Sequence, residues 1–276
     1  MRIFYPDFRT KAVTFSFDDG VVQDIRLTAL FRRYGLRATF NINSGLFGAV
    51  HSFTTSDGRD VTTTRMEEDC IRRVYPGFEI ASHGSLHKGL DRLPREELDA
   101  ELGADVARLS ELCGTRVRGY AYPGGSFGGG CAARLQQYGL CYARTVQSKR
   151  NFALPDNFYY WHPTCHENDP ALPELLARFC GAEDPCDLPL FYLWGHAYEL
   201  DFDDTDRWAR IEQTCATLAG REDCYYATNI ELYDYITAAR ARTEDDRTIR
   251  NPSAQSVWLE YRGARLCLPA GEALKK

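Results

Sequence analysis

Two adjacent carboxylates, Asp18 and Asp19, end a short apolar run near the start of the chain, in residues 14–20 (TFSFDDG). Paired carboxylates at one site can divide their roles, because one can bind a metal ion while the other accepts a proton. Gly20 lets the chain turn, so both side chains can enter one pocket. Taken alone, the segment is equally compatible with a polar turn that opens a helix.

Two histidines four residues apart, His83 and His87, follow a second apolar run at residues 78–82. In a helix this spacing places both imidazoles on one face. Imidazole is a common ligand of Zn²⁺, so the pair could hold one ion. The position directly after a strand-like run with a glycine turn favours a metal site over two unrelated surface histidines.

A second pair with the same spacing, His162 and His166, encloses a possible thiolate ligand at Cys165. Pro163 interrupts helical geometry there, and no clear apolar strand precedes the pair. The segment therefore predicts a loop near the mouth of the site, where His166 or Trp161 could touch a substrate. A purely structural loop is the more frequent use of such a segment.

Two more strand-like runs end in groups that can stabilise or transfer charge. Residues 117–125 end in Pro-Gly-Gly, a turn whose backbone N–H groups can hold an oxyanion. His196 follows the most apolar run of the chain, where a barrel places catalytic residues. A histidine there can act as a general acid because it titrates near neutrality. A plain turn and a hydrogen-bonded buried histidine are the structural alternatives.

Short apolar runs alternate with amphipathic segments along the chain, which predicts repeated βα units. About seven such units indicate a parallel sheet closed as a (β/α) barrel. The expected strands are residues 12–17, 38–42, 78–82, 120–122, 141–145, 190–194 and 224–228, and the expected helices are residues 21–34, 64–74, 94–113, 131–138, 172–179, 207–218 and 230–240.

The last part of the chain differs from the rest. Residues 256–261 and 265–268, on either side of Gly263, predict a β-hairpin. No linker divides the chain, so we expect one catalytic domain over residues 1–276, with residues 250–276 as a hairpin tail on the barrel.

Charge and composition narrow the function classes. The chain has 33 Lys and Arg against 39 Asp and Glu, a net charge of -6, which argues against nucleic-acid binding. Its longest strongly apolar run, residues 188–194, is too short to span a membrane. Charged residues interrupt the N-terminus, so we expect no signal peptide and a cytoplasmic protein. Ten cysteines without C-x-x-C spacing are then expected to be reduced and mostly buried.

Taken in order, the four polar segments resemble the polysaccharide deacetylase family, carbohydrate esterase family 4. The resemblance rests on the Asp-Asp pair, the His-x-x-x-His pair, the Pro-Gly turn and the strand-borne histidine, and it spans residues 14–196. It implies a distorted β/α barrel that hydrolyses an N-acetyl group or a similar linear amide. The sequence WGHAYE at residues 194–199 is similar to a bacterial subgroup of polysaccharide-deacetylase-like proteins without export signals.

The resemblance implies a role for each matching position. One divalent metal ion is expected, Zn²⁺ first, with Co²⁺, Ni²⁺ or Mn²⁺ as alternatives. A general base acts on water and a general acid on the departing amine. In this sequence the metal ligands are Asp19, His83 and His87, the base and acid are Asp18 and His196, the oxyanion is held by the N–H near Gly124, and Trp161 and Trp194 are expected beside the substrate.

Two positions that support these residues differ from the family pattern. Gly84 stands where the family usually has Ser or Thr after the first metal-binding histidine. Ala121 stands where the family usually has an Arg that holds the catalytic aspartate. The partner of Asp18 is therefore left open.

Two further departures affect the acid and the acyl pocket. Tyr160 precedes Trp161 where the family usually has an Asp, so Asp156 and Glu199 become the candidates to orient the catalytic histidine. Trp194 replaces a usual Leu, and its larger indole would narrow the pocket for the acetyl methyl group.

Three functions are compatible with these residues and with the resemblance. The first is a deacetylase of an N-acetylated amino sugar, oligosaccharide or polysaccharide. The second is a hydrolase of a small cyclic amide or imide, because a cytoplasmic protein has poor access to wall polysaccharide. The third, a non-catalytic carbohydrate-binding relative, ranks last because all the expected ligands and catalytic groups are present.

Overall fold

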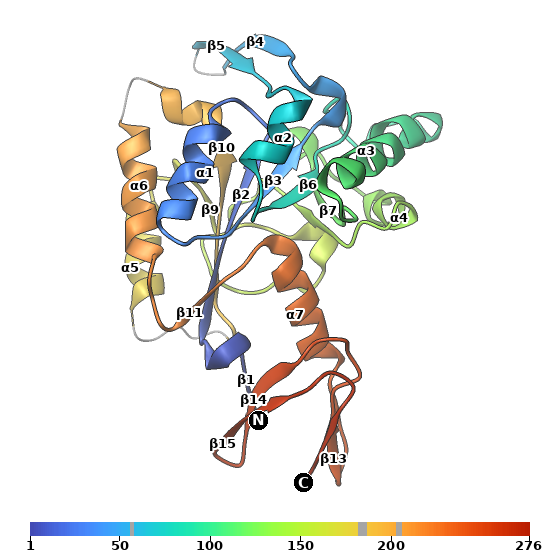
Figure 1. The fold of residues 1–276 in the computed structure, drawn as a ribbon, viewed down its shortest axis with the longest axis vertical. Helices are drawn as coiled ribbons and strands as arrows, with labels where there is room; N and C mark the ends of the chain where they lie inside the picture. Colours follow the sequence, from blue (N-terminus) through green and yellow to red (C-terminus); the bar gives the residue numbers. More distant parts are fainter. Residues whose placement is uncertain (56–57, 182–186, 203–205) are drawn as a thin grey trace.

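The computed structural model describes residues 1–55, 58–181, 187–202 and 206–276 (Figure 1). Its main sheet contains β2 (Lys11–Asp18), β3 (Ala38–Ile42), β6 (Glu79–Ser82), β7 (Gly119–Ala121), β8 (Tyr142–Arg144), β9 (Cys165–His166), β10 (Leu190–His196) and β11 (Cys224–Tyr226). The strand order is β8-β7-β6-β3-β2-β10-β9, with β11 also paired to β2. Every pairing in it is parallel. The seven-strand path curls into a half-barrel, so the predicted α/β barrel fold is confirmed.

Helices cover the outer face of this sheet (Figure 1). All seven predicted helices are present, but three begin later than expected, the first at Asp24 rather than residue 21. Residues 64–67 lie in a hairpin and a loop, and residues 94–103 contain a 3-10 turn and a π-helical turn, Asp99–Gly103. The helices are α1 (Asp24–Arg33), α2 (Glu68–Val74), α3 (Ala104–Cys113), α4 (Cys131–Gln137), α5 (Leu172–Cys180), α6 (Arg207–Leu218) and α7 (Asn229–Ala241).

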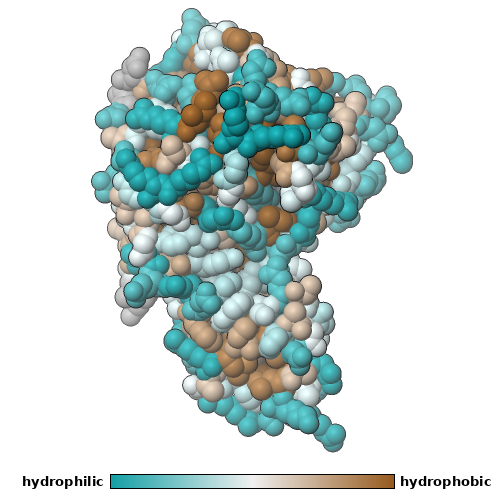
Figure 2. Space-filling model, in the orientation of Figure 1, coloured by the Kyte–Doolittle hydropathy of each residue, from teal (hydrophilic) through white to brown (hydrophobic). Residues whose placement is uncertain are grey.

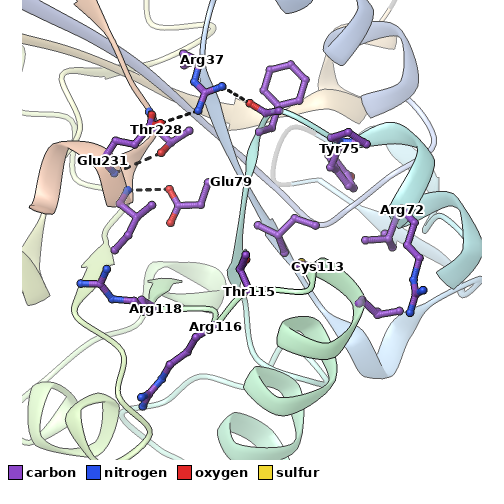
Figure 3. A pocket seen from close by; sticks show the side chains of 17 residues that line it. Arg37, Arg72, Tyr75, Glu79, Cys113, Thr115, Arg116, Arg118, Thr228 and Glu231 are labelled. Atoms are coloured by element: carbon purple, nitrogen blue, oxygen red, sulfur yellow. Dashed lines mark hydrogen bonds and ion pairs between the residues drawn. The ribbon is translucent and has the colours of Figure 1, made fainter.

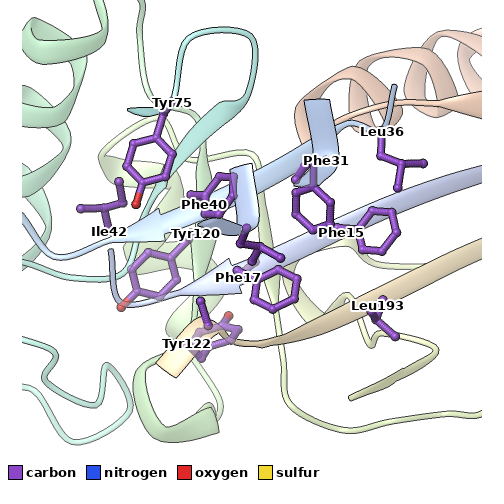
Figure 4. Close-up of a cluster of buried hydrophobic side chains, with 14 of the residues drawn as sticks. Phe15, Phe17, Phe31, Leu36, Phe40, Ile42, Tyr75, Tyr120, Tyr122 and Leu193 are labelled. Atoms are coloured by element: carbon purple, nitrogen blue, oxygen red, sulfur yellow. The ribbon is translucent and has the colours of Figure 1, made fainter. Parts of the chain in front are cut away.

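The alternation of side chains along β2 directs polar groups into the barrel. All eight residues of the strand are buried. Phe15 and Phe17 point outward, and their ring centroids lie 4.8 and 5.9 Å from that of Phe31 on α1 (Figure 4). Residues two apart in a strand share a face, so Thr14 and Asp18 point the other way, into the barrel. The apolar packing outside therefore determines which aspartate faces inward.

An antiparallel hairpin that the sequence did not predict connects β3 to α2. It consists of β4 (Val50–Thr54) and β5 (Asp60–Thr64), which stand beyond the carboxyl ends of the barrel strands (Figure 1). Most residues of β4 are exposed, so the strand lacks the apolar alternation by which a half-buried strand is recognised.

The predicted tail hairpin is confirmed as β14 (Val257–Tyr261) and β15 (Ala264–Leu268). Arg262 and Gly263 join the strands with φ of 52° and 79°, which fits a two-residue hairpin turn. The appendage is larger than predicted, because β1 (Arg2–Phe4) pairs with β14. A second small sheet is formed by β12 (Thr243–Glu244), β13 (Thr248–Arg250) and β16 (Ala273–Lys275).

The surface, the helices and the cysteines can be compared with what the composition predicts about membrane spans and thiols. Hydrophilic residues dominate the visible face of the barrel in Figure 2. Among the described residues, no helix combines the length and apolarity that crossing a bilayer requires. The nine described cysteines are free thiols; four of them are buried, four are half-buried and Cys267 is exposed. Cys186 lies outside the described residues.

Candidate active site

The carboxyl ends of β2 and β10 and the loop after β6 bring five predicted residues together. His83 Nε2 lies 3.8 Å from Asp18 Oδ2 and 3.8 Å from Asp19 Oδ1. His87 Nε2 lies 3.8 Å from the same Asp19 oxygen. His196 Nε2 lies 3.7 Å from Asp18 Oδ2. The separate segments of the sequence therefore form one cluster of two carboxylates and three imidazoles.

A turn of the backbone lets two adjacent aspartates face one site. Strand alternation would point Asp19 away from Asp18, but Asp19 has a φ of 85°, in the left-handed region. Its N–H donates to the Asn41 carbonyl on β3 over 2.8 Å, which ties the turn to the sheet. Arg65 Nη1 donates to the Asp19 carbonyl over 2.8 Å and lies 2.8 Å from Oδ1.

His83 and His87 are held in the neutral form. His83 is buried, and its Nδ1 lies 2.9 Å from the Ala121 carbonyl at the end of β7. A carbonyl only accepts, so Nδ1 carries the proton and Nε2 presents its lone pair to the aspartates. Burial lowers the pKa of His83 to about 3 and that of His87 to about 4. A neutral imidazole with a fixed tautomer is the form that coordinates metal ions.

The loop that carries these histidines is not helical, so the predicted helical spacing is wrong as an explanation. Its conformation comes from Glu101, a buried carboxylate on the π-helical turn. Glu101 Oε1 accepts from the N–H groups of Leu86 and Lys88 over 3.1 and 2.9 Å, on either side of His87. A Cβ on Gly84 would lie 2.5 Å from this oxygen, so the carboxylate occupies the space that a larger residue would need.

The partner of Asp18 is Arg144, the last residue of β8. Its Nη2 donates to both carboxylate oxygens, and Asn41 Nδ2 donates to Oδ1 over 2.8 Å. Arg144 is fully buried and reaches across the barrel interior. Burial alone would raise the pKa of Asp18, but the charge of the Arg144 guanidinium beside it holds that pKa well below its usual value. Asp18 is therefore ionised.

The sequence did not identify Arg144 as the partner of Asp18, because it is a single arginine that lies 126 positions away along the chain. It supplies from β8 the contact that the family pattern places at Ala121. Sequence offered only one indirect signal, a charged residue at the end of a predicted strand.

Glu199 orients His196, whereas the other candidate, Asp156, is exposed. His196 Nδ1 lies 2.8 Å from Glu199 Oε1, which leaves Nε2 directed toward Asp18. Burial would raise the pKa of Glu199, but its hydrogen bond to His196 lowers it. Arg207 Nη1 lies 3.5 Å from the other oxygen of Glu199. The carboxylate is thus charged and fixed on both sides.

Trp161 does not reach the site, so its predicted contact with substrate is wrong. Only 1% of its surface is exposed. Its ring packs edge-on against Phe158, Tyr192 and Tyr142, at centroid distances of 4.9, 5.2 and 5.5 Å. The indole fills the core because residues 161–166 bridge from β8 to β10, with Trp161 N bonded to Ala143 and Thr164 N bonded to Tyr192.

Trp194 lies beside the cluster. The Arg144 guanidinium carbon is 4.6 Å from its ring centroid, and the His166 ring stands edge-on at 4.5 Å. His166 Nε2 also lies 3.8 Å from Glu199 Oε1. His166 therefore lines the site, whereas His162 bonds Thr145 Oγ1 through Nδ1 over 2.6 Å.

The turn at Gly124 follows β7 directly. Gly124 has a φ of 59°, and the hydrogen bonds of the turn are donated by Gly125 and Ser126. Its own N–H is not used by the turn, as an oxyanion donor requires.

Two groups in the described part of the chain have ligand atoms close enough to hold a metal ion. They are Asp19 with His83 and His87, and His166 with His196 and Glu199. In the second group His196 and Glu199 already share a direct hydrogen bond. Cys165 belongs to neither group, and burial raises the pKa of its thiol to about 12, so it stays protonated.

A cavity of about 690 Å³ lies at the amino end of β6, away from these residues (Figure 3). Its polar groups bond to one another. Glu79 Oε2 accepts from Ile230 N over 2.8 Å, and Arg37 Nη2 lies 2.7 Å from Glu231. These bonds hold the start of α7 against the sheet, and none of the predicted site residues lines the cavity.

Comparisons with known proteins agree with this geometry. A model of the polysaccharide deacetylase family matches residues 6–143. No curated protein matches the chain in sequence. A Mycobacterium smegmatis protein assigned to the polysaccharide deacetylases shares the fold, with 16% identity and a TM-score of 0.58 over 87% of this chain and 94% of that one.

Two other solved structures have the same fold. The Puue allantoinase is 13% identical, with a TM-score of 0.56 over 83% of this chain and 91% of that one. A mutant carbohydrate esterase family 4 pseudoenzyme with restored enzymatic activity is 14% identical, with a TM-score of 0.51 over 84% and 70%. At such identities the likeness concerns the fold alone.

Proposed function

Because this chain belongs to the polysaccharide deacetylase family, whose model matches residues 6–143, we propose that it is a metal-dependent hydrolase. Its substrate is an N-acetylated amino sugar, oligosaccharide or polysaccharide. The observation that carries the proposal is the convergence of Asp19, His83 and His87 beside Asp18 and His196.

The residues present fit a divalent ion. Asp19 Oδ1 is buried and accepts no hydrogen bond of good geometry. Its charge is compensated by the Arg65 guanidinium, whose Nη1 lies 2.8 Å away. Two neutral imidazoles direct Nε2 toward Asp19 Oδ1, each at 3.8 Å. One carboxylate and two imidazoles suit Zn²⁺, and Co²⁺, Ni²⁺ or Mn²⁺ accept the same donors. Such an ion would polarise the amide carbonyl and acidify water.

The remaining side chains move and hold protons. Asp18, kept ionised by Arg144, takes a proton from water at Oδ2. His196 Nε2, 3.7 Å from that oxygen, delivers a proton to the departing amine, while Glu199 fixes its ring. The free N–H of Gly124 donates to the oxyanion. Trp194 borders the acyl group.

Removing the Asp19 carboxylate is the direct test of this function. The protein as isolated should contain one equivalent of divalent metal by elemental analysis, and Asp19→Ala should contain almost none. Deacetylation should fall about 10³-fold or more, since a catalytic metal supplies several kcal/mol. Asp69→Ala is the control, because Asp69 is exposed and its carboxylate pairs with Arg73 on the same helix. Equal metal content and activity in Asp19→Ala would refute the proposed site.

Glu101 is expected to act on metal affinity through the loop that carries His87. Glu101→Gln keeps the size of the side chain but removes its charge, so its oxygen is a weaker acceptor for the two loop N–H groups, and its NH₂ group cannot replace Oε2, which accepts from Leu86 N over 3.1 Å. We expect affinity, measured by competition with a chelator, to fall about 10- to 100-fold, as for other groups that orient ligands. Glu97→Gln is the control, because the half-buried Glu97 carboxylate bonds the exposed Lys88 ammonium and not the N–H groups of the loop. Unchanged affinity in Glu101→Gln would contradict this role.

A second candidate is hydrolysis of a small cyclic amide or imide. Trp194 favours it, because the indole is packed by Arg144 and His166 where an acetyl methyl group would need room. The Puue allantoinase has the same fold. A panel of N-acetylglucosamine oligomers and cyclic imides separates the two candidates. Acetate release without ring opening supports the deacetylase, and ring opening without acetate release supports the alternative.

A further inference from the structure

A second group of metal-binding atoms meets at the Nδ1 side of the His196 ring. Glu199 Oε1 lies 2.8 Å from His196 Nδ1, and His166 Nε2 lies 3.8 Å from the same Glu199 oxygen. One ligand atom of each residue lies within 4.8 Å of those of the other two. In a tetrahedral Zn²⁺ site, with bonds of about 2.0–2.1 Å, neighbouring ligand atoms stand about 3.3 Å apart. The two measured distances lie on either side of this value, so small side-chain shifts bring the three groups around one ion.

The two groups that flank His196 are in the protonation states that a metal ion requires. Burial lowers the pKa of His166 to about 4, so this imidazole is neutral. Its Nδ1 lies 3.3 Å from both Asn168 Oδ1 and Asn168 N, and a metal ion at Nε2 selects the tautomer in which Oδ1 accepts the Nδ1 proton. Glu199 is ionised, as described above. The three ligand side chains are 17–20% exposed, so an ion from solvent can reach them.

The surrounding charges make this site weaker than the one at Asp19. The Arg207 guanidinium, with Nη1 3.5 Å from Glu199 Oε2, opposes a second cation. Glu167 Oε1 lies 3.6 Å from the same Nη1 and 4.0 Å from His166 Nδ1, so it partly compensates that charge. An ion must also displace the proton between His196 and Glu199, whereas His83 Nε2 already presents a free lone pair to Asp19.

We propose that His166, His196 and Glu199 bind a second divalent metal ion, and that this ion inhibits hydrolysis. The ion takes the place of the proton on His196 Nδ1, which leaves to solvent. The ring then carries one proton, on Nε2, and losing it would produce an imidazolate, so the ring is a far poorer acid than an imidazolium. The binding follows from the side-chain geometry, and the inhibition rests on the proposed function, in which His196 is the general acid.

Zinc binding tests the site without turnover. The probe is ZnCl₂ alone, added to the protein as isolated and followed by equilibrium dialysis with elemental analysis. We expect the parent protein to reach two equivalents and Asp19→Ala, which lacks the first site, to reach one. His166→Gln should lower the affinity for the second ion by at least about 10- to 100-fold, the effect of removing even a group that only orients a ligand. His162→Gln is the matched control, because His162 precedes His166 in the same segment, bonds Thr145 and belongs to neither group of ligands.

Acetate release tests the inhibition. Zinc that fills the second site should lower the rate about 10²-fold or more in the parent protein and in His162→Gln, since a general acid contributes at least that much. His166→Gln, compared with its own rate at one equivalent of zinc, should be little affected by the same concentration.

A parent protein that binds only one equivalent of zinc, or a second equivalent that His166→Gln binds as tightly, would overturn the second site. Undiminished acetate release with both sites filled would overturn the inhibition. Failure of the proposed function has a different signature, which is the lack of acetate release at one equivalent of zinc. In that case the zinc stoichiometry of the variants still decides whether the second site exists.

Discussion

Replacing Arg144 with Met is expected to lower the free energy of unfolding by about 3–5 kcal/mol, the usual effect of breaking a buried ion pair. Arg144 is fully buried, and Asp18 is 2% exposed. Without the guanidinium, the Asp18 carboxylate of the metal-free protein keeps the Asn41 hydrogen bond but loses the cation that compensates its charge. Either Asp18 stays charged at a high cost, or it takes up a proton and can no longer act as a base.

Chemical denaturation measures this loss, with Arg144→Lys and Arg92→Met as companions. Lysine keeps the charge but cannot bond both carboxylate oxygens with a fixed fork, so a smaller loss is expected. In that variant the kcat should fall more than the KM changes, because the aspartate is displaced while the substrate contacts remain. Arg92 is 88% exposed, so its replacement should cost less than about 0.5 kcal/mol. An Arg144→Met variant as stable as the parent would show that the pair does not support the fold.

Asp18→Asn is expected to lower the kcat by about 10²- to 10⁴-fold, the usual contribution of a general base. The amide oxygen can still accept the hydrogen bond from Asn41, but it cannot take a proton from water. The proposed ligands Asp19, His83 and His87 are untouched, so metal content should stay at one equivalent. Activity is measured below the melting temperature, because Arg144 loses its charged partner in this variant.

Asp24→Asn is the matched control for that experiment. Asp24 is also a buried aspartate, and burial raises its pKa to about 8, so it is mostly protonated at pH 7. It accepts a hydrogen bond from Tyr75 over 2.6 Å, and amidation removes little charge. The control should retain most of the parent activity. Full activity in Asp18→Asn would show that another group is the base.

The strands and helices of the barrel were predictable because their signals are local. Residues 13–17 alternate between apolar and polar positions, and this pattern both forms β2 and sends Asp18 inward. Where the signal depends on distant partners, prediction stopped short. β1 pairs with β14 from the opposite end of the sequence, so the extended appendage leaves no short-range pattern. The β4–β5 hairpin has too few buried residues to be recognised.

The candidate site divides in the same way. The sequence by itself determined which groups can do the chemistry, because Asp18, Asp19, His83, His87 and His196 stand directly at or after strand ends. Parallel strands end at one edge of a sheet, so residues in these positions must converge.

Only the tertiary structure decided which residues hold those side chains in place and which predicted residue lies outside the site. Arg144 holds Asp18, Glu101 holds the loop that carries His83 and His87, and Glu199 holds the His196 imidazole. Trp161 packs in the core and does not reach the site. The physical reason is that a charge or hydrogen bond acts over a few ångströms in space, whatever the separation along the chain. Arg144 and Asp18 meet across the barrel although 126 positions separate them.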